Sequence, residues 1–569
     1  MQISADSMKA ITGRAAKLDN DFSWFRTKGQ DIQKYVVPWR GRALGGQSKS
    51  DDNGESYDDT SIHNTIVQQC LQVASAGIKS GISPSSRPWF RVGVRERKIV
   101  EGGPAALWLA RVEQILYTIF QRANVYDALQ EIFTELLAFG TGAAAVVPDK
   151  ETIIRVRPFT YGEYRLGLDH RHKVGLMTRK YYMTVGQLVS EFTQEHCSQR
   201  VKDLYKDGNL EEKILIRNLI EKSDDRYDLK EALGRAYRSI YWEDGVEGNL
   251  VLAIRGFDLF PILSSTWETV GGQVYGIGPG HTNLRNAKRL QKLEEDSLQQ
   301  LALQNKPPLL SSVANQNNAI DTSPWGVTYD NSPPGNPGIG PLYQVNPNTQ
   351  EIEFKIERTE KALRDGFFNN IFMMITNSQD NIKTAYQTAR MMEEKYSVLG
   401  PVIERSQHML GDLIAIAYDY AQQAGEIPEP PEELQGEDLK IEYISVLAQA
   451  QKISGLQSIN DTMAFVASIA QVWPEARHKV DAMQAVDEIA SVNGTPPSVI
   501  RSDDDASAMV AAEQQAAQRA QQAEQAMMAT EGARNLKDVR VGGKPAIDSM
   551  AQAMAGQVPG ANPGGPQNG

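Results

Sequence analysis

Cysteine and long hydrophobic runs are both scarce in this chain. The 569 residues contain only two cysteines, Cys70 and Cys197, which excludes a disulfide framework and a four-cysteine zinc site. The longest uncharged apolar stretch, residues 136–147, is too short to span a bilayer. The N-terminus also lacks a basic region followed by an apolar run. We therefore expect a protein that is assembled in the cytoplasm and makes no membrane contact.

An excess of positive charge is missing as well. The chain has 59 Lys and Arg against 71 Asp and Glu, a formal net charge of -12. Dedicated nucleic-acid-binding proteins usually carry a basic excess, so any contact with DNA must be local. Hydrophobic content of 41% is ordinary for a globular protein, and the length is sufficient for three or four domains of about 150 residues.

Recognisable catalytic and metal-binding motifs are also absent from the sequence. The glycine-rich run 276–280 is not followed by the Gly-Lys-Ser/Thr of a phosphate-binding loop, so it predicts a turn before a helix. His170, His172 and the pair His196-Cys197 have no second ligand pair at metal spacing. We expect no catalytic residue, no metal site, no cofactor and no enzymatic activity.

Two helix-length amphipathic segments are the most informative feature that is present. The first, residues 281–306, ends at two prolines, and the second covers residues 351–375. In the first, four cations at i, i+3, i+4 and i+7 share one face: Arg285, Lys288, Arg289 and Lys292. In the second, an apolar stripe has helical spacing: Ile352, Ile356, Leu363 and Phe367. The segments flank residues 311–348, rich in Pro, Gly and Asn, which predicts a helical pair with a loop-rich module at its far end.

The remaining sequence predicts an α+β fold that is mainly helical. The first 140 residues have helical periodicity, and residues 143–260 contain short β-rich runs separated by Gly, Asp and Asn. A long helix is expected over 384–425, kinked rather than ended by Pro401. Residues 506–531 are almost entirely Ala, Gln and Glu, which indicates either a helix that depends on assembly or a disordered segment.

Five sequence blocks carry a resemblance to a known family. They are residues 32–40, 274–279, 306–310, 399–401 and 441–451. In number, order and spacing they resemble the portal (head-to-tail connector) proteins of T7-like, short-tailed bacteriophages. The resemblance implies a ring, usually of twelve copies, at the unique vertex of the capsid in the virion, through which DNA is packaged and ejected. It implies as partners double-stranded DNA without sequence preference, terminase, tail adaptor (nozzle) proteins, and the major capsid and scaffolding proteins.

The resemblance also implies a division of the chain into the parts of a portal subunit. These are a wing (1–275), a first stem helix (276–306), a clip (307–350), a second stem helix (351–375), a tunnel loop (376–383), a kinked long wing helix (384–427), a crown (428–502) and a barrel helix or disordered tail (503–569).

Candidate contact residues follow from this division. For the DNA channel they are the basic stripe Arg285, Lys288, Arg289 and Lys292 and the loop residues Thr376, Asn377, Ser378, Gln379, Asp380, Asn381 and Lys383. The stripe could instead pair with Glu294, Glu295 or carboxylates of a neighbouring subunit, and the loop could be an ordinary helix connector. In the clip, the aromatic residues Trp325, Tyr329 and Tyr343 are candidates for an interface, with packing against a neighbouring clip as the alternative.

Two other classes of function are compatible with the same sequence features. One is a structural ring or adaptor through which no DNA passes. The other is an enzyme whose site is assembled between subunits from residues that no linear motif reveals.

Overall fold

The computed structural model describes most of the chain. The described residues are 5–40, 44, 62–94, 103–223, 234–245, 250–311, 321, 339–341, 349–373, 385–434, 439–443, 462–470, 473, 475, 480, 484–486, 489, 503–538, 540–541 and 544–545.

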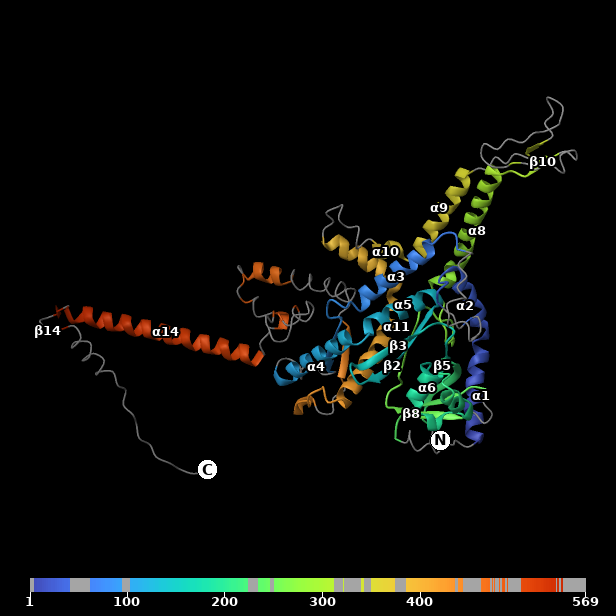
Figure 1. Cartoon of the computed structure of the whole chain (residues 1–569). Helices are drawn as coiled ribbons and strands as arrows, with labels where there is room; N and C mark the ends of the chain where they lie inside the picture. Colours follow the sequence, from blue (N-terminus) through green and yellow to red (C-terminus); the bar gives the residue numbers. More distant parts are fainter. Residues whose placement is uncertain are drawn as a thin grey trace, which may run out of the picture.

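Most residues of the described elements lie in helices (Figure 1). The first group is α1 (Ala5–Asp21), α2 (Ser23–Tyr35), α3 (Ile66–Ile82), α4 (Gly103–Arg122), α5 (Val125–Phe139), α6 (Val185–Phe192) and α7 (Gln199–Lys206). The later ones are α8 (Pro279–Asn305), α9 (Thr349–Gly366), α10 (Asn369–Met373), α11 (Ala385–Gln423) and α14 (Asp503–Asp538). Two short 3₁₀ helices, η4 (Gln194–His196) and η7 (Glu432–Leu434), complete the described set.

The strands are concentrated in the middle of the sequence, as predicted. A five-stranded antiparallel sheet has the order β4 (Tyr164–Leu168), β5 (Val174–Thr184), β6 (Lys213–Lys222), β7 (Tyr237–Glu243) and β8 (Val251–Phe257). A three-stranded sheet has the order β3 (Ile153–Phe159), β2 (Thr141–Asp149) and β9 (Ile262–Thr266). Three two-stranded ribbons pair β1 (Phe90–Val94) with β12 (Leu439–Tyr443), β10 (Leu309–Ser311) with β11 (Ile339–Pro341), and β13 (Arg540–Val541) with β14 (Lys544–Pro545). The expected α+β fold is therefore confirmed.

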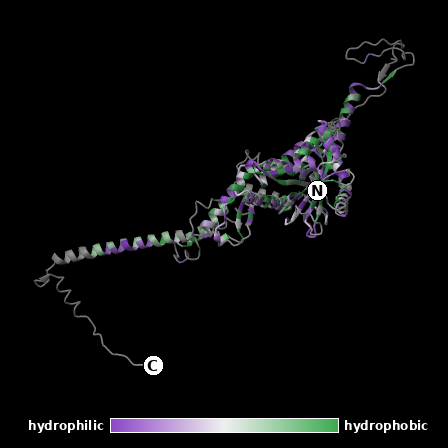
Figure 2. Ribbon diagram, turned by 60° about the horizontal axis from the view of Figure 1, so that its bottom comes forward, coloured by the Kyte–Doolittle hydropathy of each residue, from purple (hydrophilic) through white to green (hydrophobic). Residues whose placement is uncertain are grey.

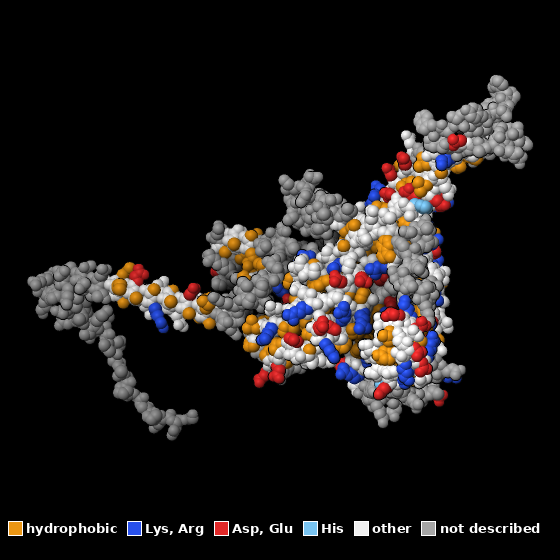
Figure 3. Space-filling view, viewed as in Figure 1, with side chains coloured by type: hydrophobic (Ala, Val, Ile, Leu, Met, Phe, Trp, Pro, Cys, Tyr) orange, Lys and Arg blue, Asp and Glu red, His pale blue; other side chains and the backbone are white. Residues whose placement is uncertain are grey.

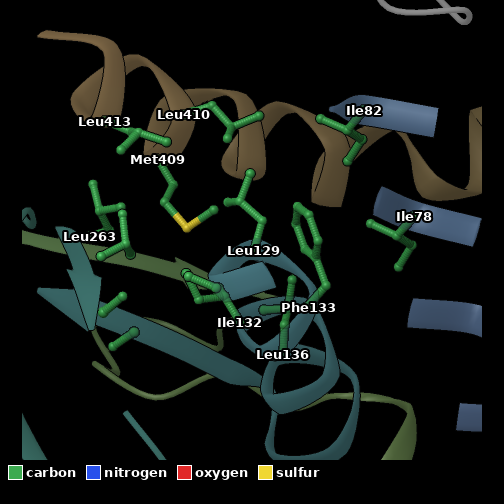
Figure 4. Close-up of a cluster of buried hydrophobic side chains, with 14 of the residues drawn as sticks. Ile78, Ile82, Leu129, Ile132, Phe133, Leu136, Leu263, Met409, Leu410 and Leu413 are labelled. Carbon is green, nitrogen blue, oxygen red and sulfur yellow. The ribbon is translucent and has the colours of Figure 1, made fainter. Parts of the chain in front are cut away.

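Helix α5 lies at the centre of the main hydrophobic core (Figure 4). Its buried side chains contact α11, α3 and β9, and the labelled members of the cluster are Leu129, Ile132, Phe133, Leu136, Met409, Leu410, Leu413, Ile78, Ile82 and Leu263. Full burial of each Leu, Ile, Met or Phe side chain contributes about 1.5–3 kcal/mol to folding. The helix ends at Gly140, whose φ of 74° is the left-handed conformation that glycine adopts readily.

Two long helices project from this body as a pair. Figure 1 shows α8 and α9 side by side, with the β10–β11 ribbon at their far end, which confirms the predicted helical pair. Helix α14 extends from another side of the body and stands clear of it in Figure 2 as well. Its side chains from Ser507 to Met528 are exposed, so this helix packs against no other described element over that length.

Two sequence predictions need correction. Residues 351–375 do not form one helix, because α9 ends at Gly366 and α10 begins at Asn369. At the break, Phe368 has a φ of 60°, which is outside the α-helical region, and Gly366 lies against Asn283 of α8, where a Cβ would be 2.1 Å from Asn283 Oδ1. The second correction concerns α6 and α7, two short helices that the sequence did not predict inside the β-rich region. Each begins at a capping residue, Thr184 or Ser198, whose side-chain oxygen accepts a backbone N–H.

The backbone also shows the course of the helix around Pro401 and the pairing of the strand at residues 439–443. Helix α11 continues through Pro401, as predicted. Strand β12, which the sequence division placed at the start of the crown, pairs with β1 in the register Phe90 to Tyr443 and so belongs to the body. The division of the chain into portal parts otherwise stays a prediction.

The glycine-rich run before α8 passes unusually close to the end of α5 and the start of β2. A Cβ at Gly276 would lie 2.3 Å from the carbonyl oxygen of Gly140, and one at Gly280 would lie 2.1 Å from that of Ala138. The backbone N–H of Gly276 donates to Thr141 Oγ1 (2.9 Å). These glycines therefore permit a backbone-to-backbone contact that any side chain would prevent.

We expect Gly280→Ala to lower the midpoint of thermal unfolding, because its methyl group cannot fit against Ala138 without moving the start of α8. Overpacking of this kind costs about 1–3 kcal/mol or more. The control is Gly81→Ala in α3, where no atom lies within 4 Å of the added Cβ. That change should leave the midpoint unchanged or raise it, since alanine is favoured over glycine in a helix by about 1 kcal/mol. Equal midpoints for the two variants would contradict the close contact.

Candidate functional site

The projecting helix pair is held to the body by one face of each helix. Ala287 and Leu290 of α8 are fully buried, as are Leu363 of α9 and Phe367, which directly follows α9. Helix α8 packs against α2 and α5, and α9 packs against α3. Of the predicted apolar stripe, Leu363 and Phe367 are therefore buried, whereas Ile352 and Ile356 are only partly buried.

The basic stripe on α8 divides into two kinds of residue. Lys288 Nζ forms an ion pair with Asp31 of α2 (2.9 Å) and lies 5.2 Å from the ring centre of Tyr35. Lys292 Nζ pairs with Glu295 and Asp296 of its own helix, each at 3.1 Å. Hydrogen bonds with Asp296 and Glu295 raise the pKa of Lys292. For these two lysines, pairing within the chain is the outcome that the structure supports.

Arg285 and Arg289 differ from the two lysines. Both guanidinium groups are exposed, and no carboxylate in the described part of the chain lies within ion-pair distance of either. Helical spacing puts them on the side of α8 that is turned away from Ala287. They are therefore available to a ligand or to a neighbouring subunit.

A residue that sequence reasoning missed, Asn64, connects both helices to the body. Its side-chain amide donates hydrogen bonds to Glu294 Oε1 of α8 (2.8 Å) and Glu360 Oε1 of α9 (3.0 Å). Its backbone N–H donates to Gln291 Oε1 (3.0 Å), and Gln291 Nε2 donates to its carbonyl oxygen (2.8 Å). No sequence pattern indicates this role, because Asn64 lies 230 and 296 residues from its carboxylate partners. Glu294, which was considered as a partner for the basic stripe, is instead engaged here.

His281 lies in the first turn of α8. Its Nδ1 accepts a hydrogen bond from the backbone N–H of Gly278 (3.3 Å), the residue that precedes the helix. Burial, with a smaller contribution from the charge of Lys28, lowers the pKa of His281 to about 4. The imidazole is therefore neutral near pH 7, which is the state that can accept the Gly278 N–H.

Comparison with known proteins assigns the chain to a family. Residues 8–500 match the family described as bacteriophage head to tail connecting protein. The chain is 32% identical to the portal protein of Salmonella phage epsilon15 over 541 residues, which cover 95% of this chain and 97% of that protein. The chain belongs to the family of bacteriophage head-to-tail connecting, or portal, proteins.

Two further comparisons are weaker. The probable portal protein of Bordetella phage BPP-1 is 30% identical over 553 residues, covering 96% of this portal-family chain and 98% of that protein. A chain from the virion of a native gene transfer agent particle is 9% identical, with a TM-score of 0.32 over 76% of this chain and 94% of that chain. That score is too low for the likeness to support an argument. The T7-like, short-tailed subtype stays a prediction.

Membership of the family gives the function in outline. The protein is a structural component of the virion at the head-to-tail junction, where it forms a portal ring at the capsid vertex for the passage of DNA. Among the described residues, no helix is long and apolar enough to cross a membrane. In the same part of the chain, no group of three or more His, Cys, Asp and Glu could hold a metal ion.

Two groups of predicted contact residues lie outside the described residues. One is the loop 376–383, with Thr376, Asn377, Ser378, Gln379, Asp380, Asn381 and Lys383. The other consists of the clip aromatics Trp325, Tyr329 and Tyr343.

The lowered pKa of His281 predicts an acid-sensitive start of α8. Since the folded-state pKa lies below the ordinary value of 6.5, the stability contributed by the neutral ring is present above pH 6.5 and is lost as the pH falls toward 4. We expect His281→Gln to remove this loss, because glutamine at this position can accept the same N–H without titrating. Thermal unfolding of both proteins between pH 4 and pH 7.5 measures the difference. Parallel curves over that range would show that His281 is not the titrating group.

Proposed function

We propose that this portal-family chain assembles into a ring of twelve copies in which the α8–α9 pairs surround the DNA channel. The observation that carries the proposal is the helix pair itself, which projects from the body and exposes large apolar side chains. Leu298 and Leu301 near the end of α8 are 55% and 42% exposed, and Phe354 of α9 is 63% exposed. Apolar side chains gathered on a projecting pair (Figure 3) favour burial against a neighbouring copy.

The charge distribution supports a channel that guides DNA without holding it. Each neutralised phosphate adds salt-dependent affinity, so many cations per subunit would bind the duplex too tightly for passage. Twelve copies carry a formal charge of -144 (12 × -12), which makes repulsion dominant. On α8, pairing of Lys288 and Lys292 with carboxylates leaves Arg285 and Arg289 as the DNA-contacting residues in this proposal.

The remaining parts of the chain take further roles in the proposal. Residues 376–383 form a tunnel loop whose one cation, Lys383, approaches the duplex. The clip, residues 307–350, binds terminase during packaging and tail adaptor proteins afterwards, with Trp325, Tyr329 and Tyr343 as anchors. The wing contacts the major capsid and scaffolding proteins during assembly in the host cytoplasm, and α14 extends the crown. The protein itself carries out no catalysis.

Ring formation is the first expected outcome. Twelve copies of the 63.0 kDa chain give a mass of about 756 kDa (12 × 63.0), measured by native mass spectrometry, with an axial hole visible in negative-stain images. A single-copy particle, even with capsid components present, would contradict the proposal. A ring with no axial hole would favour the structural adaptor, and hydrolysis of nucleotide by the purified ring would favour an enzyme.

We expect Arg285→Ala combined with Arg289→Ala to reduce DNA packaging while rings still form, because these groups have no partner in the described part of the chain. The matched control is Lys288→Ala with Lys292→Ala, which removes the same charge from groups that already have carboxylate partners. The control should change packaging less. Packaging in vitro and native mass of both variants measure the two effects. Loss of rings in the arginine variant would show that Arg285 and Arg289 pair with a neighbouring subunit instead.

A further inference from the structure

The hydrogen bonds of Asn64 join three helices at one residue. Besides its bonds to Gln291, Glu294 and Glu360, Asn64 Oδ1 accepts the backbone N–H of Ile66 (2.9 Å), in the first turn of α3. We propose that Asn64 is a positioning residue that fixes both stem helices, α8 and α9, on the wing helix α3. When α3 moves, both stem helices then move with it.

The chemistry of the junction requires a neutral donor at this position. The carboxylates of Glu294 and Glu360 share the two N–H groups of one amide. Arg364 Nη2 compensates the charge of Glu360 at 3.1 Å, but no cation in the described residues pairs with Glu294. A carboxylate in place of the amide would offer no donor and would add a third negative charge. The junction therefore depends on the identity of Asn64 and not only on its size.

The second half of α3 contacts α10, the segment that leads to the proposed tunnel loop. Asn369 and Phe372 of α10 are both buried. The ring of Phe372 lies so close to Gly77 that a Cβ there would be 2.3 Å from it. Helix α3 thus holds α8 and α9 through Asn64, and it holds α10 through the contact of Phe372 with Gly77. The consequence for the tunnel loop rests on the proposed function, whereas the coupling of α3 to the stem does not.

Hydrogen exchange of the full-length assembled protein tests the coupling. We expect Asn64→Asp to make the backbone amides of α9 and of the body end of α8 exchange about tenfold faster or more at pH 7.5, because charged hydrogen bonds are lost. At pH 5 the difference from the wild-type protein should shrink, since two neighbouring carboxylates raise the pKa of the new acid and protonation restores a donor. A purely structural defect would not depend on pH in this way. The control Asn209→Asp adds the same charge at an exposed turn and should change neither region.

The second test swaps the amide donor and the carboxylate acceptor between positions 64 and 294. In the double variant Asn64→Asp with Glu294→Gln, the glutamine amide can donate to the new carboxylate, so exchange in α8 should return toward the wild-type rate. If Asn64→Asp alone fails to fold, the double variant must still fold. Unchanged exchange in the single variant, or no recovery in the double variant, would overturn the role of Asn64. Neither result depends on DNA passage, so the ring mass and packaging measurements test the proposed function separately.

Discussion

The contact between the glycine-rich run and the end of α5 sets the direction of α8 and therefore of the α8–α9 pair. Because Gly276 and Gly280 bring their backbones against Gly140 and Ala138, the first turn of α8 has a fixed position and rotation on the core. A helix rotates by about 100° per residue, so the rotation of the first turn decides the direction of every later side chain. Ala287 then faces the core, Lys288 faces α2, and Arg285 lies on the open side.

The sequence predicted those elements whose signal is local. Helical periodicity identified α8 and α9, and the distribution of β-branched and turn residues located the sheets. The break between α9 and α10 could not be predicted in this way, because the positive φ of Phe368 and the approach of Gly366 to Asn283 on another helix have no signal in apolar spacing. The apolar spacing continues through the break, since Leu363 and Phe367 are both buried on the same side. Periodicity reports which face is buried and not whether the backbone is continuous.

In the candidate site, too, some features follow from neighbouring residues in the sequence and others depend on the packing of distant segments. That four cations share a face of α8 is a property of the sequence, and the pairing of Lys292 with Glu295 and Asp296 follows from i, i+3 and i, i+4 spacing. The partner of Lys288, Asp31, lies on a helix more than 250 residues earlier, so its pairing depends on how α2 packs against α8. Asn64 makes a local bond to Ile66 at the start of α3, but no local pattern indicates its bonds to Glu294 and Glu360. In the folded chain the stripe therefore divides into two lysines with carboxylate partners and two exposed arginines.

Helix α14 shows what a sequence can specify without tertiary contacts. It begins after residue 500, where the match to the family ends, and it packs against no other described element between Ser507 and Met528. Alanine, glutamine, glutamate and methionine are strong helix formers, and its 36 residues exceed the length of about 12–15 at which an isolated helix is marginal. Local propensity can therefore support the helix. Alanine side chains bury too little area to hold it against a single partner, but their small size allows helices to approach closely, so neighbouring copies in the ring are the partners that its composition suits.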